Sequence, residues 1–267
     1  MSRKLIVVLA VVIAVLIARV APALAITYGE ADGNGHPNVG ILVYDYEGQK
    51  VGLCSGTLIS PKVFLTAGHC TAYLSSLGID PDAVWVSFDP VFTESSTFFS
   101  GTYYTNQAYY TRSFTAESDL GVVILDEPVG ITPASLPTVG MLDKMGPRGL
   151  RRQQFTAVGY GDIQPLIGHG PPIFEDFGTR RVATSTFNGL NKNWLRLSGN
   201  NATGNGGTCY GDSGGPNFLV VDGQEVIAGI TVTGDTMCLA TNVDLRLDTD
   251  AALSFLNSSF VCPSSHF

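Results

Sequence analysis

Short apolar runs recur along most of the chain, and within them hydrophobic and polar residues alternate with a period of two. This period is typical of β-strands that bury one face, and turn-forming residues separate the runs. In the first half we expect six strands: Val39 to Tyr46, Leu53 to Ile59, Val63 to Thr66, Val84 to Phe88, Phe98 to Tyr104 and Leu120 to Leu125.

A second set of apolar runs follows a connection near residues 134–149 that contains proline and glycine. The expected strands are Gln153 to Tyr160, Thr179 to Phe187, Trp194 to Ser198, Asn217 to Val221, Glu225 to Val232 and Thr241 to Leu247. A helix is predicted from Thr249 to Asn257, with Asp248 as its N-cap. Because no periodic helix interrupts the strands, the pattern predicts an all-β fold and argues against alternating βα units.

The first 25 residues have the pattern of a signal peptide. Arg3 and Lys4 precede an apolar run, and Ala23-Leu24-Ala25 is a cleavage sequence. A membrane anchor is the alternative, but the run from Leu5 to Ala18 is shorter than the roughly 20 residues that a spanning helix needs. We therefore expect a secreted protein that does not associate with the membrane after cleavage.

Composition and charge limit the classes of partner. The chain has 267 residues, of which 14% are charged and 45% hydrophobic. Cleavage after Ala25 would leave 12 basic and 23 acidic residues, a net charge of about −11. Nucleic acids and anionic lipids need clustered Lys and Arg, so neither is an expected partner. We expect a monomer.

Five cysteines in an exported chain are expected to be mostly paired, although their spacing does not fix the connectivity. The sequence has neither a CxxC nor an HExxH motif, so we expect no metal and no cofactor. Asn201-Ala202-Thr203 and Asn257-Ser258-Ser259 fit the N-glycosylation sequon.

Three separate stretches contain the residue types of nucleophilic catalysis. Gly211-Asp212-Ser213-Gly214-Gly215-Pro216 places a serine among glycines, whose backbone can bend around it. Thr66-Ala67-Gly68-His69-Cys70 supplies a histidine, and Ser118-Asp119-Leu120-Gly121 supplies an acid. A serine hydroxyl needs a base such as imidazole to take its proton, and a carboxylate can fix the tautomer of that imidazole. The backbone amides of Gly211 and Ser213 would form an oxyanion hole.

The glycine–serine stretch also fits the G-x-S-x-G nucleophile elbow of α/β-hydrolases. In such an esterase the acid and then the histidine follow the serine, and here the only histidine after Ser213 is His266, next to the C-terminus. The observed order His69, Asp119, Ser213, with these flanking residues, instead resembles the trypsin-like (chymotrypsin-fold) serine peptidases. The resemblance implies two packed six-stranded antiparallel β-barrels with a short C-terminal helix. Residues 26–138 would form the barrel with His69 and Asp119, and residues 139–267 the barrel with Ser213.

The resemblance also implies two disulfides. Cys54 with Cys70 would close a loop of about 15 residues, which is worth roughly 3 kcal/mol on the chain-entropy model. Cys209 with Cys238 would bracket Ser213. Cys262 is left over, and the sequence does not identify a partner for it.

The family's primary specificity pocket maps onto Gly207 and Thr208, with Gly234 as the wall glycine that pairs with extended substrate. Because no charge stands at Gly207, we expect an uncharged residue, apolar or aromatic, before the scissile bond. Asp235 and Asp244 leave an alternative open, since either carboxylate could enter the pocket and restore a preference for basic residues.

Cleavage after Ala25 would create an N-terminus at Ile26, similar to the Ile-Val-Gly-Gly start of activated members of the family. The resemblance implies that its ammonium pairs with Asp212, because a buried carboxylate without a partner is costly. Tyr28 departs from the family's glycine, and an ordinary frayed N-terminus is the alternative.

The sequence therefore predicts a secreted serine endopeptidase that acts on proteins or peptides through an acyl-enzyme. The alternative is a catalytically weak or silent homologue that serves as a binding module, since the fold does not dictate the function.

Overall fold

The structure is a computed structural model that describes residues 26–111, 118–162 and 177–258. The predicted signal peptide, Cys262 and His266 lie outside the described residues. Within the described part of the chain, no helix is long and apolar enough to cross a membrane.

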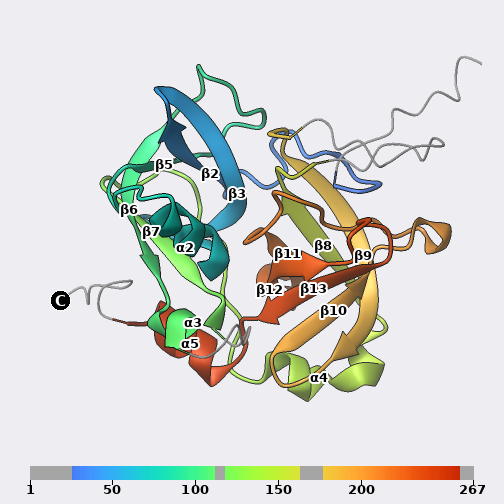
Figure 1. Cartoon of the computed structure of the whole chain (residues 1–267). Coiled ribbons are helices and arrows are strands. Elements are labelled where there is room, and N and C mark those ends of the chain that lie inside the picture. Colours follow the sequence, from blue (N-terminus) through green and yellow to red (C-terminus); the bar gives the residue numbers. More distant parts are fainter. Residues whose placement is uncertain (1–25, 112–117, 163–176, 259–267) are drawn as a thin grey trace, which may run out of the picture.

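Six antiparallel strands form a first closed barrel, drawn in blue to green in Figure 1, in the order β2-β3-β4-β7-β6-β5. Most side chains of its central strands are buried, as their apolar runs require. The strands are β2 (Val39–Tyr46), β3 (Gln49–Ser60), β4 (Val63–Thr66), β5 (Val84–Ser87), β6 (Phe99–Thr105) and β7 (Gly121–Leu125).

A second antiparallel barrel follows, and a pairing of β8 with β9 closes it. Its order is β9-β10-β13-β12-β11-β8, and the short strand β1 (Glu30–Ala31) adds to β9 from outside. The strands are β8 (Gln154–Gly159), β9 (Arg181–Leu190), β10 (Trp194–Ser198), β11 (Pro216–Val221), β12 (Gln224–Gly234) and β13 (Thr241–Arg246). The expected all-β fold of two six-stranded barrels with a C-terminal helix is confirmed.

Helices occupy the ends and the joins of the barrels (Figure 1). They are α2 (Gly68–Ser76), α3 (Gln107–Thr111), α4 (Met141–Leu150), α5 (Asp250–Leu256) and the 3₁₀ turn η2 (Asn201–Thr203). The sequence pattern predicts only α5. Even there the predicted cap is wrong, because the Thr249 side chain caps the helix by accepting from the Ala252 amide. Asp248 instead pairs with Arg246 and accepts from the Leu142 amide.

Two clusters of buried hydrophobic residues form the core of the barrels. The larger runs from the first barrel to inward-facing residues of the second, such as Phe218, Ile230 and Leu245. The smaller fills the second barrel against α4, with Met141 and Leu150 on the helix side. The barrels are therefore packed against each other through a continuous apolar core.

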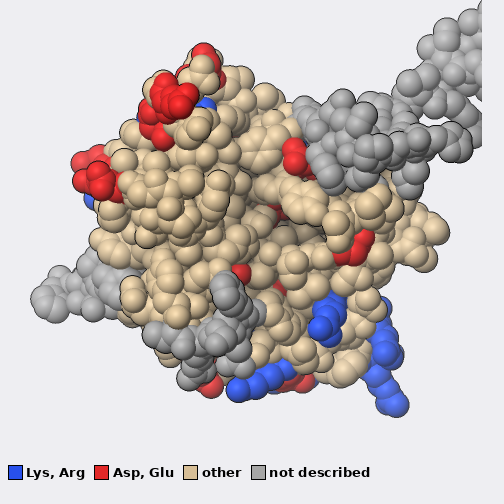
Figure 2. All heavy atoms as spheres, in the orientation of Figure 1, with Lys and Arg blue, Asp and Glu red and all other residues tan. Residues whose placement is uncertain are grey.

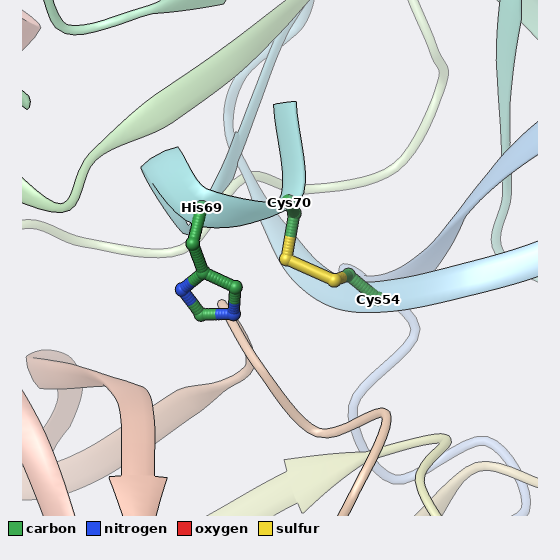
Figure 3. Close-up of side chains that lie close together, drawn as sticks. All are labelled: Cys54, His69 and Cys70. Atoms are coloured by element: carbon green, nitrogen blue, oxygen red, sulfur yellow. A yellow bond between two sulfur atoms is a disulfide. The ribbon is translucent and has the colours of Figure 1, made fainter. Parts of the chain in front are cut away.

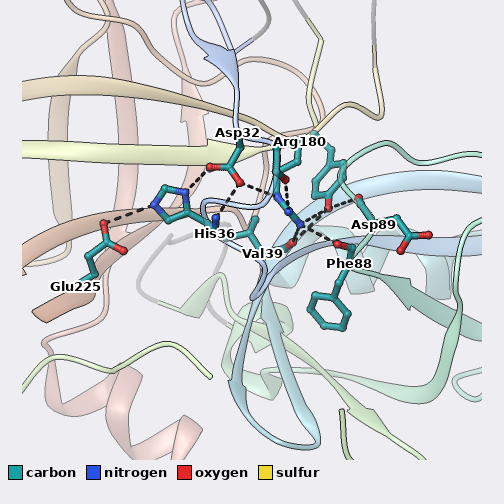
Figure 4. Close-up of polar contacts among 9 residues, drawn as sticks. Asp32, His36, Val39, Phe88, Asp89, Arg180 and Glu225 are labelled. Carbon is teal, nitrogen blue, oxygen red and sulfur yellow. Dashed lines mark hydrogen bonds and ion pairs between the residues drawn. The ribbon is translucent and has the colours of Figure 1, made fainter. Parts of the chain in front are cut away.

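A buried arginine also joins the two barrels (Figure 4). Arg180 is fully buried, and its guanidinium pairs with Asp32 at 3.0 Å. It also donates to the carbonyls of Val39 and Phe88 in the first barrel and to the Tyr160 hydroxyl at the end of β8. These hydrogen bonds and the ion pair offset the free-energy cost of removing the guanidinium charge from water.

Candidate active site

His69 lies in the first turn of α2, immediately after β4. The next residue, Cys70, forms a disulfide with Cys54 on β3, so the beginning of the helix is tied to the barrel wall (Figure 3). Gly68 is required here, since a Cβ would lie 2.9 Å from the Leu120 amide nitrogen. The helix can therefore begin directly against the segment that carries Asp119.

Asp119 orients His69 through two hydrogen bonds. One carboxylate oxygen accepts from the His69 amide at 2.7 Å, and the other is 2.9 Å from ring Nδ1. The acid side chain is only 6% exposed, whereas the imidazole is 32% exposed. With Nδ1–H directed at the carboxylate, Nε2 is left as the basic nitrogen. The structure thus brings together the two predicted residues from 50 positions apart.

The Ser213 loop of the second barrel lies against the start of α2. Gly214 has φ +79°, and a Cβ on it would lie 2.5 Å from the Ala67 amide nitrogen. The Ser213 carbonyl oxygen is 3.9 Å from the Cys70 sulfur. Among the described residues, no hydrogen bond joins the Ser213 hydroxyl to the His69 ring.

Only some of the backbone amides of this loop have a hydrogen-bond acceptor within the described protein. Those of Asp212, Gly214 and Gly215 donate to backbone carbonyls within the protein. Within the described chain, the amides of Gly211 and Ser213 have no acceptor. Two N–H groups on either side of Asp212 are thus left for an outside oxygen, which is what an oxyanion hole provides.

Ser55 on β3 supports this loop and was not identified from the sequence. Its hydroxyl donates to the Gly211 carbonyl at 3.0 Å and accepts from the Tyr160 amide at 2.9 Å. Its position beside Cys54 is the only sequence signal that could have pointed to it.

Asp212 is fully buried, and in the described chain it has no ion pair. Its carboxylate accepts from the amides of Cys209 and Gly161, each at 2.8 Å. Burial raises the pKa of this carboxyl to about 7 despite those two donors. Ile26 is also fully buried, and the Thr27 carbonyl accepts from the Gly207 amide at 3.0 Å.

A cavity of about 250 Å³ opens beside Ser213. The Cys209–Cys238 disulfide borders it, and the predicted residues Thr208 and Gly234 line it. Gly207 is buried behind Thr208 and pairs with Thr27. Two of the three residues predicted for the specificity pocket therefore line one cavity, whereas Gly207 is not among its lining residues.

Of the two acids that could have altered the charge of this cavity, Asp235 lines it and Asp244 does not. Asp235 lines it, and its carboxylate accepts from the backbone amides of Leu239, Ala240 and Thr241. Burial raises the pKa of Asp235, but these donors outweigh it and hold the pKa below its usual range. Asp244 lies fully buried on β13.

Cys54, His69 and Cys70 lie close enough together to resemble a metal site (Figure 3). Both sulfurs are in the disulfide, however, so neither is a thiolate that could bind a metal.

The two-barrel architecture defines the class: this is the chymotrypsin-like fold. A sequence model of the Trypsin family matches residues 34–247, and the chain belongs to that family.

Two curated relatives agree with this assignment. Brachyurin from Leptuca pugilator is 29% identical over 197 residues, which cover 70% of this chain and 78% of that protein. The snake venom serine protease serpentokallikrein-1 from Protobothrops mucrosquamatus is 27% identical over 236 residues, covering 79% of this chain and 80% of that protein.

Proposed function

We propose that the protein is a secreted serine endopeptidase that uses Ser213, His69 and Asp119. The single observation that carries the proposal is the pair of hydrogen bonds between Asp119 and His69. His69 lies on α2, which packs against the Ser213 loop. Membership of the trypsin family supports the reaction class.

The reaction begins when His69 Nε2 takes the hydroxyl proton of Ser213 as Oγ bonds to the carbonyl carbon of the substrate. Charge develops on the carbonyl oxygen, toward which the amides of Gly211 and Ser213 donate. The C–N bond then breaks, and the amine leaves with the proton from Nε2. Water, deprotonated by the same nitrogen, hydrolyses the ester and restores the hydroxyl.

Maturation at Ile26 is part of the proposal. Ile26 is buried close to the Gly207 segment, and Asp212 is a buried carboxyl without an ion pair in the described chain. A free ammonium at residue 26 would neutralise that carboxylate and fix the loop that holds the oxyanion amides. Release of residues 1–25 would then be both export and activation, giving a secreted monomer that acts on proteins or peptides.

The cavity favours an uncharged residue before the scissile bond. None of the described residues that line it is Lys, Arg or His, so it offers no counter-ion to an acidic side chain. Asp235, its one carboxylate, already accepts three backbone hydrogen bonds.

Labelling by a fluorophosphonate, together with cleavage of a mixed peptide library, tests the function. Protein that begins at Ile26 should be labelled and should cleave peptides, and Ser213→Ala should abolish both. Asp119→Asn should keep the fold but lower kcat by about 10⁴-fold, because the imidazole then takes the wrong tautomer. A folded sample that neither reacts nor cleaves would overturn the proposal in favour of a binding module.

A further inference from the structure

The exposed basic side chains gather on the second barrel (Figure 2). Among the described residues, every exposed Lys or Arg lies in or just after α4, in the turn between β9 and β10, or on β10. We call these residues the basic patch: Lys144, Arg148, Arg151, Arg152, Lys192 and Arg196. The exposed charged residues on the described part of the first barrel are all acids: Glu47, Asp80, Asp82, Glu94, Asp126 and Glu127. The net charge of the chain does not reveal this separation.

The basic patch is one surface, because α4 packs against the β9–β10 hairpin. Leu150 of α4 is buried in the same core cluster as Leu195 and Leu197 of β10. Since successive side chains of a strand face opposite ways, Arg196 between these leucines stands on the outer side of the barrel. At the turn of the hairpin, Lys192 lines a cavity together with the beginning of α4.

Most charges of the basic patch are not neutralised within the protein. Within the described chain, four of them have neither an ion pair nor a side-chain hydrogen bond: Arg148, Arg151, Arg152 and Arg196. Asp143, the acid of α4, pairs with Arg246 instead, at 2.7 Å.

Three of these arginines share one helical turn. The Arg151 amide donates to the Pro147 carbonyl at 3.1 Å, so the turn continues past the end of α4 and places Arg148 next to Arg151 and Arg152. Like charges at this spacing destabilise a helix. An anion bound among the three guanidinium groups would remove that repulsion.

Strand β10 connects the basic patch to the cavity beside Ser213. Arg196 lies three residues before Gly199, which is about 10 Å along an extended strand. The Gly199 amide donates to the Ala240 carbonyl at 2.9 Å, and Ala240 is two residues from Cys238, which lines the cavity. A polypeptide bound in the cavity can therefore reach the patch with a short further stretch of chain.

The chemistry of the basic patch fits a short acidic segment of polypeptide. A guanidinium group donates two parallel hydrogen bonds to a carboxylate. Charges are screened beyond about 8 Å at physiological ionic strength, so a short segment is attracted by the patch and is little affected by the acidic first barrel. A long polyanion would also meet Asp143 and Asp250, which line the cavity next to Lys192.

We propose that the basic patch binds an acidic segment of protein substrates, outside the residues that enter the cavity, and so selects among proteins that share a cleavage sequence. This rests on the proposed function, because it names the substrate class of the same enzyme. None of the patch residues lines the cavity beside Ser213. The attraction therefore speeds association and lowers KM, while kcat stays unchanged.

The test uses the chain beginning at Ile26 and pairs of substrates that share one sequence cleaved by the protein. A linker of about 20 Gly and Ser residues, which reaches about 25 Å on average, joins that sequence to a run of Glu or to an equal run of Gln. The run precedes the cleaved sequence in one pair and follows it in the other.

At about 20 mM salt we expect kcat/KM for the Glu substrate to exceed that for the Gln substrate by at least about 5-fold in one of the pairs. The ratio should approach one at about 0.5 M salt, because the patch is exposed to solvent. No preference for Glu in either pair at low salt would overturn the inference.

Variants connect the preference to the basic patch. Arg148→Gln with Arg152→Gln should bring the ratio close to one, whereas Arg148→Lys with Arg152→Lys, which keeps the charge, should retain most of it. The matched control, Lys50→Gln with Lys62→Gln, removes two charges from the first barrel and should leave the ratio unchanged. All three variants should cleave the Gln substrate like the wild type. A ratio that survives the Arg→Gln changes, or is lost in the control, would contradict the assignment.

A binding measurement separates this inference from the proposed function. Fluorescence anisotropy of a labelled Glu-run peptide, measured with Ser213→Ala, detects the patch without cleavage. A protein that binds this peptide but is never labelled by a fluorophosphonate refutes the proposed function and leaves the patch as a docking surface. Cleavage of the Gln substrate without binding of the Glu run refutes only this inference. Binding of a sulfated polysaccharide in place of the Glu run would overturn it in favour of that partner.

Discussion

At the scale of the residue, burial disfavours the charged form of the Asp212 carboxyl. It is fully buried beside the Ser213 loop, and two backbone donors do not offset the loss of water, so the pKa of the carboxyl rises to about 7. A carboxyl with a raised pKa binds a proton in the folded state that the unfolded chain has already released.

We expect this to make the stability of a chain still joined at Ala25–Ile26 fall as pH rises. Stability contributed by protonated Asp212 is complete below the ordinary carboxyl range, is lost between about pH 4 and 7, and is constant above that. The loss is at most about 4 kcal/mol, from the 1.36 kcal/mol per unit of pKa. Denaturant unfolding at a series of pH values measures it.

Asp212→Asn is the control and should remove this component of the pH profile. A chain that begins at Ile26 should lack the decline as well, because the ammonium stabilises the ionised carboxylate. Identical profiles for the joined and cleaved chains would contradict the proposed ion pair.

The sequence was sufficient to predict His69 and Asp119 as neighbours, because their flanking residues are specific when taken together. It was not sufficient for Ser55 or for the buried hydrogen bond between Asn242 and Asn217. Asn242 approaches Asn217 only because β13 and β11 both lie beside β12 in one particular register. A shift of one residue would turn these side chains to the other face of the sheet.

At the scale of the element, α5 depends on its cap. The Thr249 hydroxyl accepts from the Ala252 amide and so satisfies one of the helix's unpaired donors. Thr249→Ala should lower the free energy of unfolding by about 1 kcal/mol, whereas Thr249→Ser should be close to neutral. Urea unfolding measures both, and an equal loss in the two variants would show that the hydroxyl is not responsible.

The strands could be predicted because alternating burial leaves its period in the sequence. The three other helices could not. Helix α4 contains Gly146 in a non-helical conformation and Pro147 within its length, two residues that argue against a helix in any pattern. Its apolar side packs on the smaller core cluster, and this tertiary packing holds it in place.

Arg180 joins the segment around Asp32 to both barrels (Figure 4). Arg180→Met should cost about 3–5 kcal/mol, because the buried Asp32 would keep only His36 as a partner and the carbonyls of Val39 and Phe88 would lose their donor. The exposed Arg152 provides the matched control, and Arg152→Met should change stability by less than about 0.5 kcal/mol. Guanidinium unfolding of both variants checks this, and similar midpoints would mean that the buried pair contributes little.

At the scale of the whole molecule, the basic residues gather in one region, and the two disulfides both lie near the candidate site. Figure 2 shows Lys and Arg gathered toward the lower part of the second barrel, and few of them on the described face between the barrels. Each barrel carries one disulfide among the described residues, and each lies next to the candidate site.

Removing the Cys54–Cys70 disulfide by double substitution to Ala should lower the free energy of unfolding by about 3 kcal/mol, since the two cysteines are 16 positions apart. It should also reduce kcat, since α2 carries His69 and loses its tie to β3. Removing Cys209–Cys238 should instead affect KM more, because that bond borders the cavity. Calorimetry and steady-state kinetics on both variants distinguish these outcomes. Equal effects of the two variants on kcat and on KM would contradict the separate roles assigned to the two disulfides.

The imidazole and its acid come from one barrel, while the hydroxyl comes from the other. Under the proposed mechanism, neither half of the polypeptide therefore contains all three reacting groups. Fragments 26–138 and 139–267, produced separately, should then be inert alone and regain turnover only on reassociation. A split form of the protein would in that case report on contact between two partners fused to its halves.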